Sequence, residues 1–146
     1  TGEILKLPES FLPPCKRGRI SNMTEEIKKI LHKSEDFYKD AEYLFEGHRY
    51  EATVNRCYYA MFTAAQALLL TKGIFSKTHQ GLQIKFNELF IKTGLLPVEL
   101  GKSLNETFEK RQFGDYDVDA SISEQDAEKV VQNARLFLDS IRKVLP

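Results

Sequence analysis

Hydrophobic residues recur every three or four positions along most of the chain, which is the spacing of amphipathic helices. The first such stretch follows Asn22 or Thr24, either of which can cap a helix, and Glu25 and Glu26 then suit its first turn. Its apolar residues form one stripe, made of Ile27, Ile30, Leu31, Phe37, Tyr38, Ala41, Leu44 and Phe45. The pattern predicts a helix of about 25 residues with one buried face.

A second helix is predicted over residues 50–71, after a short break at residues 47–50. A connection this short indicates that the two helices run antiparallel. Between Cys57 and Leu70 the second helix is apolar on nearly every side, so we expect the rest of the protein to surround it. The apolar run is shorter than the stretch of about 18 residues that a membrane span needs.

Three further helices follow from end signals and periodicity. Ser76 or Thr78 can cap a third helix that ends near Gly94, and Pro97 suits the first turn of a fourth. Ser123 opens an [ST]-x-x-[DE] capping sequence before the last helix. No segment shows the sustained two-residue alternation of a strand. The sequence therefore predicts an all-α, up-and-down bundle of about five helices.

Residues 1–21 have a different composition, with three prolines and the basic cluster "KRGR" at residues 16–19. Proline removes backbone donors and interrupts helical periodicity, so we expect a tail that lies along the surface or is mobile. The basic cluster is compatible with a nucleic-acid contact, although a solvated tail is the simpler interpretation. The helical domain is expected over residues 22–146.

Charge and cysteine content narrow the possible functions. The 21 basic side chains balance 21 acidic ones, which argues against a general polyanion-binding surface and leaves room for a local basic patch. The two cysteines, Cys15 and Cys57, lack the paired spacing of a zinc or redox site. We expect no metal, no cofactor, no membrane association and a cytoplasmic location.

The fourth predicted helix carries two charged residues on its apolar stripe. Leu100, Leu104, Phe108, Arg111 and Asp115 follow one another at helical spacing, which turns the Arg111 guanidinium toward the core. One interpretation is that Arg111 and Asp115 pair with each other and fix the helix end. The other is that Arg111 lies in a cleft and binds a phosphate, for which its planar fork is suited, with Asp115 orienting it.

A second polar cluster occurs near the start of the second helix, where Asn55 and Tyr59 lie one turn apart and Arg56 lies beside them. Each residue alone is compatible with ordinary packing, but together with Arg111 they can complete a cleft. His79 opens the third helix, where backbone amides favour anions. A surface position is the favoured interpretation for His79, and a phosphate contact is the alternative.

Three stretches resemble the HEPN-domain family, whose name abbreviates higher eukaryotes and prokaryotes nucleotide-binding. They are "RYEATVNRCYYAMFTAAQALLLTKG" (residues 49–73), "KTHQGLQIKFNELFIKTGLL" (77–96) and "FEKRQFGDYD" (108–117). They are similar to the small prokaryotic stand-alone branch with its NRxYYAxF, KTHxG and RQxxDYD motifs. The resemblance covers roughly residues 24–145.

The resemblance implies a five-helix bundle that is usually dimeric. Many HEPN proteins are metal-independent RNases or toxins, often encoded beside a small nucleotidyltransferase that acts as antitoxin. Their nuclease motif is an arginine followed, after four to six residues, by a histidine, in a cleft at the dimer interface.

Arg111 matches the arginine of that motif, but the positions at which the histidine would stand hold Tyr116, Asp117 and Val118. The chain therefore departs from the nuclease pattern. Tyr116 is then expected to donate a hydrogen bond or to be modified by a partner transferase.

Three hypotheses follow. The first is a module that binds nucleotide or single-stranded RNA phosphate through Arg111, Asn55, Arg56, Tyr59 and His79, and acts as a homodimer with a small nucleotidyltransferase in a toxin–antitoxin-like or defence system. The second is a metal-independent endoribonuclease with an altered site, whose candidate catalytic residues are Arg111, Asp115 and Tyr116. The third is a non-catalytic dimeric interaction module.

Overall fold

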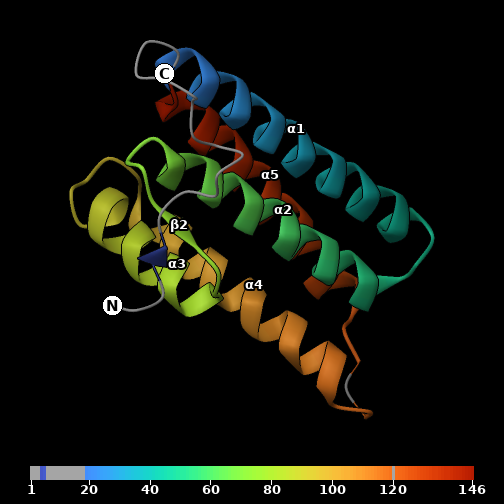
Figure 1. Ribbon diagram of the computed structural model, residues 1–146. Coiled ribbons are helices and arrows are strands. Elements are labelled where there is room, and N and C mark those ends of the chain that lie inside the picture. The colour runs from blue at the N-terminus through green and yellow to red at the C-terminus, as the bar shows by residue number, and fades with distance from the viewer. Residues whose placement is uncertain (1–3, 6–18, 120) are drawn as a thin grey trace.

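The helical periodicity of the sequence produces an all-α bundle, shown as a computed structural model in Figure 1. The structure describes residues 4–5, 19–119 and 121–146, and it describes side chains over residues 24–114, 117–119 and 121–146. In chain order the described elements are β1 (Ile4–Leu5), α1 (Arg19–Glu46), α2 (Tyr50–Leu70), β2 (Phe75–Ser76), α3 (His79–Phe86), the π-helix η3 (Asn87–Ile91), α4 (Val98–Tyr116) and α5 (Glu124–Val144). The two short strands pair antiparallel, with Ile4 opposite Ser76.

Helix α2 lies at the centre of the bundle and contacts α1, α3, α4 and α5. Figure 1 shows α1 and α2 running antiparallel. Helix α5 lies beside α2, and α4 lies on the side of α2 that faces away from α1. The part of α2 between Thr53 and Leu70 is buried on most of its sides, as its unbroken apolar sequence predicts. Its buried hydroxyl at Thr53 donates to the carbonyl of Arg49 at 2.7 Å, so the polar group has a partner.

Several helix ends confirm the sequence prediction. The Thr78 side chain accepts from the backbone N–H of Gly81 at 3.0 Å, and the Ser123 side chain accepts from the N–H of Asp126 at 3.0 Å. Each contact satisfies one backbone donor of the first helical turn. Gly94 has a φ of +80°, a conformation that glycine adopts without strain, and the chain turns there after η3.

Other boundaries differ from the prediction. Helix α1 begins at Arg19 rather than at Asn22 or Thr24, and Pro97 stands at the N-cap of α4 instead of in its first turn. The third predicted helix is two elements, because after Phe86 the backbone widens into a π-turn in which the N–H of Lys92 donates to the carbonyl of Asn87 at 2.8 Å. Apolar spacing reports which face is buried, and it does not report how wide each backbone turn is.

Helices α1 and α5 are joined by an ion pair that is only partly exposed to solvent. Arg135 on α5 donates two hydrogen bonds to the Glu35 carboxylate on α1, at 3.0 and 2.7 Å, and Arg142 donates a third at 3.2 Å. The Arg135 guanidinium also lies over the Tyr38 ring, 4.6 Å from its centroid. These hydrogen bonds, chiefly those from Arg135, hold the pKa of Glu35 below its ordinary value of 4.5.

Substitution Glu35→Gln is expected to lower the free energy of unfolding at pH 7 by about 1 kcal/mol, because it removes a charge-assisted contact that solvent partly screens. The pKa of Glu35 is lower in the folded state than its ordinary value of 4.5. The contribution of the ionised carboxylate to the free energy of unfolding is therefore present above pH 4.5, and it is lost as the pH falls through the pKa of the folded state. Urea unfolding at several pH values should show the difference between wild type and variant shrinking in acid.

The matched control is Glu25→Gln, since Glu25 is also on α1 but is 64% exposed and lies 3.6 Å from Lys28. This variant should have nearly the stability of the wild type at every pH. A Glu35→Gln protein that matched the wild type at pH 7 would contradict the role given to the ion pair.

Candidate functional site

Arg111 lies on the inward face of α4, as its spacing predicts, and is half-buried. Its Nη2 donates a hydrogen bond to the Tyr59 hydroxyl at 3.1 Å. The guanidinium carbon lies 5.4 Å from the ring centroid of Tyr58 and 5.1 Å from that of Tyr59, which is within the range of a cation–π interaction. Two adjacent tyrosines of α2 therefore position the guanidinium.

Tyr58 connects this arginine to His79. The Tyr58 side chain is buried, with 3% of its surface exposed, and its hydroxyl lies 3.1 Å from Nδ1 of His79. Burial raises the pKa of Tyr58, so its hydroxyl stays protonated and can donate. One tyrosine thus contacts the arginine through its ring and the histidine through its hydroxyl.

His79 is packed into the bundle, so the preference for a surface position was wrong. Its imidazole stacks on the phenyl ring of Phe108 with the centroids 3.8 Å apart and the planes 3° from parallel. The cap at Thr78 places His79 in the first turn of α3, from which the ring reaches α4. The ring is half-buried as a result.

The hydrogen bonds around His79 determine its neutral tautomer. Asn105 Nδ2 donates to the Glu109 carboxylate at 3.1 Å, so the Asn105 oxygen, 3.2 Å from His79 Nε2, faces the ring as an acceptor. Nε2 therefore carries the proton, and Nδ1 accepts from the Tyr58 hydroxyl. Burial is the main influence on the pKa of His79 and lowers it from 6.5, while Asn105 and Glu109 act in the opposite direction.

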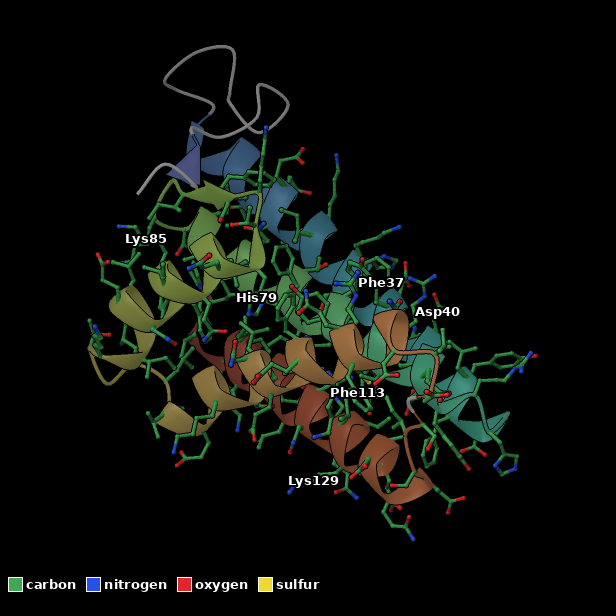
Figure 2. The ribbon with its side chains drawn as sticks, turned by 90° about the horizontal axis from the view of Figure 1, so that it is seen from below. Phe37, Asp40, His79, Lys85, Phe113 and Lys129 are labelled. Atoms are coloured by element: carbon green, nitrogen blue, oxygen red, sulfur yellow. The ribbon has the colours of Figure 1, made fainter. Side chains whose placement is uncertain are left out.

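Aromatic rings continue from this cluster toward α1. The Phe37 ring lies 5.7 Å from that of Tyr59, and Lys33 and Arg56 lie over Phe37 at 5.2 and 5.9 Å from its centroid. Figure 2 labels both ends of the row, Phe37 on α1 and His79 at the start of α3. Basic side chains thus accompany a row of aromatic rings that crosses three helices.

We use the name "Arg–His cluster" for the residues that join α2, α3 and α4 at this place: Tyr58, Tyr59, His79, Asn105, Phe108 and Arg111. A pocket of about 340 Å³ opens beside it and is lined by His79, Asn105 and Phe108 together with Gln80, Gln83 and Ile84 of α3. Its volume lies within the range of small-molecule sites. The imidazole edge is therefore accessible from the pocket.

Of the other predicted site residues, Tyr59 and Arg56 are joined to this row, and Asn55 is not. Asn55 is half-buried one turn before Tyr59, and its side chain makes no hydrogen bond to another described residue. The side chains of Asp115 and Tyr116 lie outside the described residues, although α4 continues through both positions. The Arg111–Asp115 pair therefore stays a prediction.

The sequence pattern indicated Tyr59 as a site residue, and it did not indicate Tyr58, Asn105 or Phe108. Phe108 was recognised only as part of an apolar stripe, and its contact with His79 crosses from α3 to α4. Asn105, Phe108 and Arg111 are spaced three residues apart, which places them on adjoining faces of one helix. This spacing could have indicated that Asn105 and Phe108 lie near Arg111.

The described residues also bear on metal sites and membrane spans. No group of three or more His, Cys, Asp or Glu side chains in this part of the chain is arranged to hold a metal ion. Within the same described ranges, no helix has the length and apolar character that crossing a membrane requires.

The sequence matches the family model described as HEPN domain over residues 27–144, which include every residue of the Arg–His cluster. Among curated relatives, a Methanocaldococcus jannaschii protein named "Putative toxin MJ0142" is 38% identical over 120 residues, which is 82% of this chain and 82% of the relative. A UPF0332 protein of Thermotoga maritima is 41% identical over 73% of this chain and 80% of its own length. "Putative toxin MJ0605" of Methanocaldococcus jannaschii is 34% identical over 85% of this chain and 92% of its own length.

The family match covers most of the chain, and the helical bundle agrees with it. The chain belongs to the HEPN-domain family.

Proposed function

We propose that the protein is a toxin-like HEPN module that binds the phosphate groups of single-stranded RNA or of nucleotides at the Arg–His cluster. The observation that carries the proposal is the double contact of Tyr58, whose ring meets Arg111 and whose hydroxyl meets His79. It unites a guanidinium and an imidazole in one cluster beside a pocket of about 340 Å³.

The chemistry of the cluster suits RNA. A guanidinium presents planar N–H donors that match phosphate oxygens, and this one is half-buried, where electrostatic attraction is stronger than in water. The rings of Tyr59 and Phe37 and the basic groups of Lys33 and Arg56 continue along the same row. Aromatic faces with interleaved cations bind single strands by stacking and charge without strong sequence preference.

The assembly and partner belong to the same proposal. Two relatives carry "Putative toxin" in their names, which supports a toxin-like role for this chain. We propose that the chain acts as a homodimer with a small nucleotidyltransferase, and that Tyr116 donates a hydrogen bond or is modified by that transferase. Support for this part comes from the family to which the chain belongs.

Substitution Arg111→Ala is expected to weaken binding of a short single-stranded RNA by about 10- to 100-fold, because a charge-assisted phosphate contact contributes about 1.5–3 kcal/mol. The slope of log Kd against log salt should also fall by about 0.7, the value for one lost phosphate contact on a single strand. Fluorescence anisotropy across a salt series measures both quantities.

Arg142→Ala is the matched control, since it removes the same charge from the end of α5 that contacts Glu35. It should leave both affinity and salt slope near the wild-type values. Thermal unfolding of each variant shows whether it is folded. A folded Arg111→Ala protein with wild-type affinity and slope would eliminate the phosphate site and favour a purely structural role for the arginine.

A second candidate function, metal-independent cleavage of RNA, is favoured by the position of His79. This chain lacks the histidine that the family motif has after its arginine. Tyr58 instead contacts the imidazole of His79 through its hydroxyl and the guanidinium of Arg111 through its ring. The proposed step uses the other neutral tautomer of His79, in which Nδ1–H donates to the Tyr58 oxygen and Nε2 is the acceptor. The ribose 2′-oxygen bonds to phosphorus, its proton passes to Nε2, and the bond from phosphorus to the 5′-oxygen breaks. The products are a 2′,3′-cyclic phosphate and a 5′-hydroxyl once the leaving oxygen takes up a proton.

Purified protein should then cut single-stranded RNA in the presence of EDTA, and His79→Ala should lower the rate by about 10²- to 10⁴-fold, as the loss of a general acid–base group does. The rate should fall as the pH drops through the pKa of His79, which burial places below 6.5, because the protonated ring cannot accept a proton. His32→Ala, at an exposed position on α1, is the control. Equal cleavage by the wild type and the His79→Ala variant would eliminate this mechanism.

A further inference from the structure

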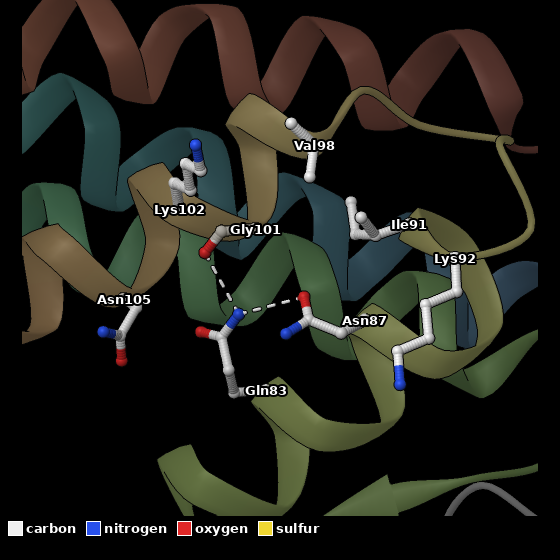
Figure 3. A pocket seen from close by; sticks show the side chains of 8 residues that line it. All are labelled: Gln83, Asn87, Ile91, Lys92, Val98, Gly101, Lys102 and Asn105. Carbon is white, nitrogen blue, oxygen red and sulfur yellow. Dashed lines mark hydrogen bonds between the residues drawn. The ribbon is translucent and has the colours of Figure 1, made fainter.

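A second pocket, of about 560 Å³, lies between the α3–η3 segment and the first turns of α4 (Figure 3). We call it the amide pocket, after the carboxamides among its lining residues, which include Gln83, Asn87, Lys92, Val98, Lys102 and Asn105. Its volume is sufficient for a nucleotide-sized ligand. The residues predicted from sequence to bind phosphate do not line it.

Two helices approach each other closely beside the pocket. A side-chain carbon added at Gly101 of α4 would lie 2.7 Å from the Asn87 side-chain oxygen in η3, closer than such atoms pack. Gly101 therefore leaves room for the Asn87 carboxamide, and η3 widens the backbone at the same place. A glycine on α4 and the widened turn of η3 therefore meet where the pocket lies.

The carboxamides at this position are held in a fixed orientation. Gln83 Nε2 donates to the Asn87 oxygen at 3.1 Å and to the carbonyl of Gly101 at 3.0 Å, both drawn in Figure 3. Asn87 Nδ2 donates to no other described residue, and the buried Gln83 oxygen accepts from none of them. The Asn87 amide therefore keeps a donor for an acceptor on a nucleobase edge, whereas the Gln83 oxygen is closed off from solvent.

The charge of the lining residues has one sign. Lys92 and Lys102 are exposed at the pocket, and none of the described residues that line it is a carboxylate, although the whole chain has equal numbers of acidic and basic side chains. Ile91 and Val98 supply an apolar wall between the two lysines. An anion with a flat, partly apolar body matches this combination better than a simple ion does.

The amide pocket adjoins the pocket of the Arg–His cluster, because Gln83 and Asn105 line both. Asn105 is also the residue that faces His79 Nε2. A strand whose phosphate lies at the cluster can therefore continue along α4 into the amide pocket.

We propose that the amide pocket is a second nucleotide subsite, in which Lys92 and Lys102 contact phosphate and the Asn87 carboxamide, oriented by Gln83, contacts the base. Its ligand is a nucleoside monophosphate unit, either within the RNA bound at the Arg–His cluster or as a free nucleotide. If the ligand is a unit of the bound RNA, the proposal rests on the function proposed above, because the amide pocket then extends that RNA site by at least one nucleotide.

The test compares two probes, a fluorescent single-stranded RNA long enough to cover both pockets and free AMP. The double variant Lys92→Ala/Lys102→Ala is expected to bind the RNA about tenfold more weakly at low salt, and the salt slope should fall by about 1.4, the sum for two phosphate contacts. Val98→Trp, which fills the apolar wall without changing charge, should weaken the same probe.

Lys129→Ala/Lys143→Ala is the matched control, since it removes two exposed positive charges from α5. It should keep the wild-type salt slope. Loss of AMP binding in the lysine variant, with RNA binding unchanged, identifies the free nucleotide as the ligand of the subsite.

Wild-type binding of both probes by the folded lysine variant and by Val98→Trp would overturn the subsite. If Arg111→Ala still lost RNA binding in that case, the function proposed above would stand without it. If Arg111→Ala also bound normally, both proposals would fall.

Discussion

The structure depends on burying a tyrosine hydroxyl at the centre of a helical bundle. Tyr58 stands on α2, the helix that the other helices surround, and only 3% of its surface is exposed. A phenol hydroxyl at such a depth needs a hydrogen-bond partner, and His79 of α3 supplies it. Leu82 and Phe86 pack α3 into the core, and the hydrogen bond to Tyr58 then fixes the start of α3 against α2, with the imidazole against Phe108 of α4.

The same constraint gives the site its electrostatic character. Around Tyr58 the bundle holds a guanidinium over one ring face and a neutral imidazole at the hydroxyl, so cationic and proton-accepting groups share a small region. Burial disfavours the imidazolium, which lowers the pKa of His79. Helices carry every member of the cluster, so the phosphate binding proposed above would need no large reorganisation of these side chains.

Apolar periodicity was enough to predict the bundle, the central position of α2 and the inward direction of Arg111, because each follows from a pattern within one helix. The caps at Thr78 and Ser123 were equally local. The contact between His79 and Asn105 joins residues 26 positions apart on different helices, so its existence depends on how α3 packs on α4. The π-turn at η3 also escaped prediction, since it widens one backbone turn without changing which residues are apolar.

The central claim is that Arg111 and His79 form one anion-binding site, and an NMR titration of the His79 ring tests it most directly. In the free protein the pKa of His79 should lie below 6.5, because burial disfavours the charged ring. Saturating single-stranded RNA should raise that pKa, because a phosphate beside the ring favours its protonated form. An identical pKa of His79 with and without bound RNA would contradict the claim.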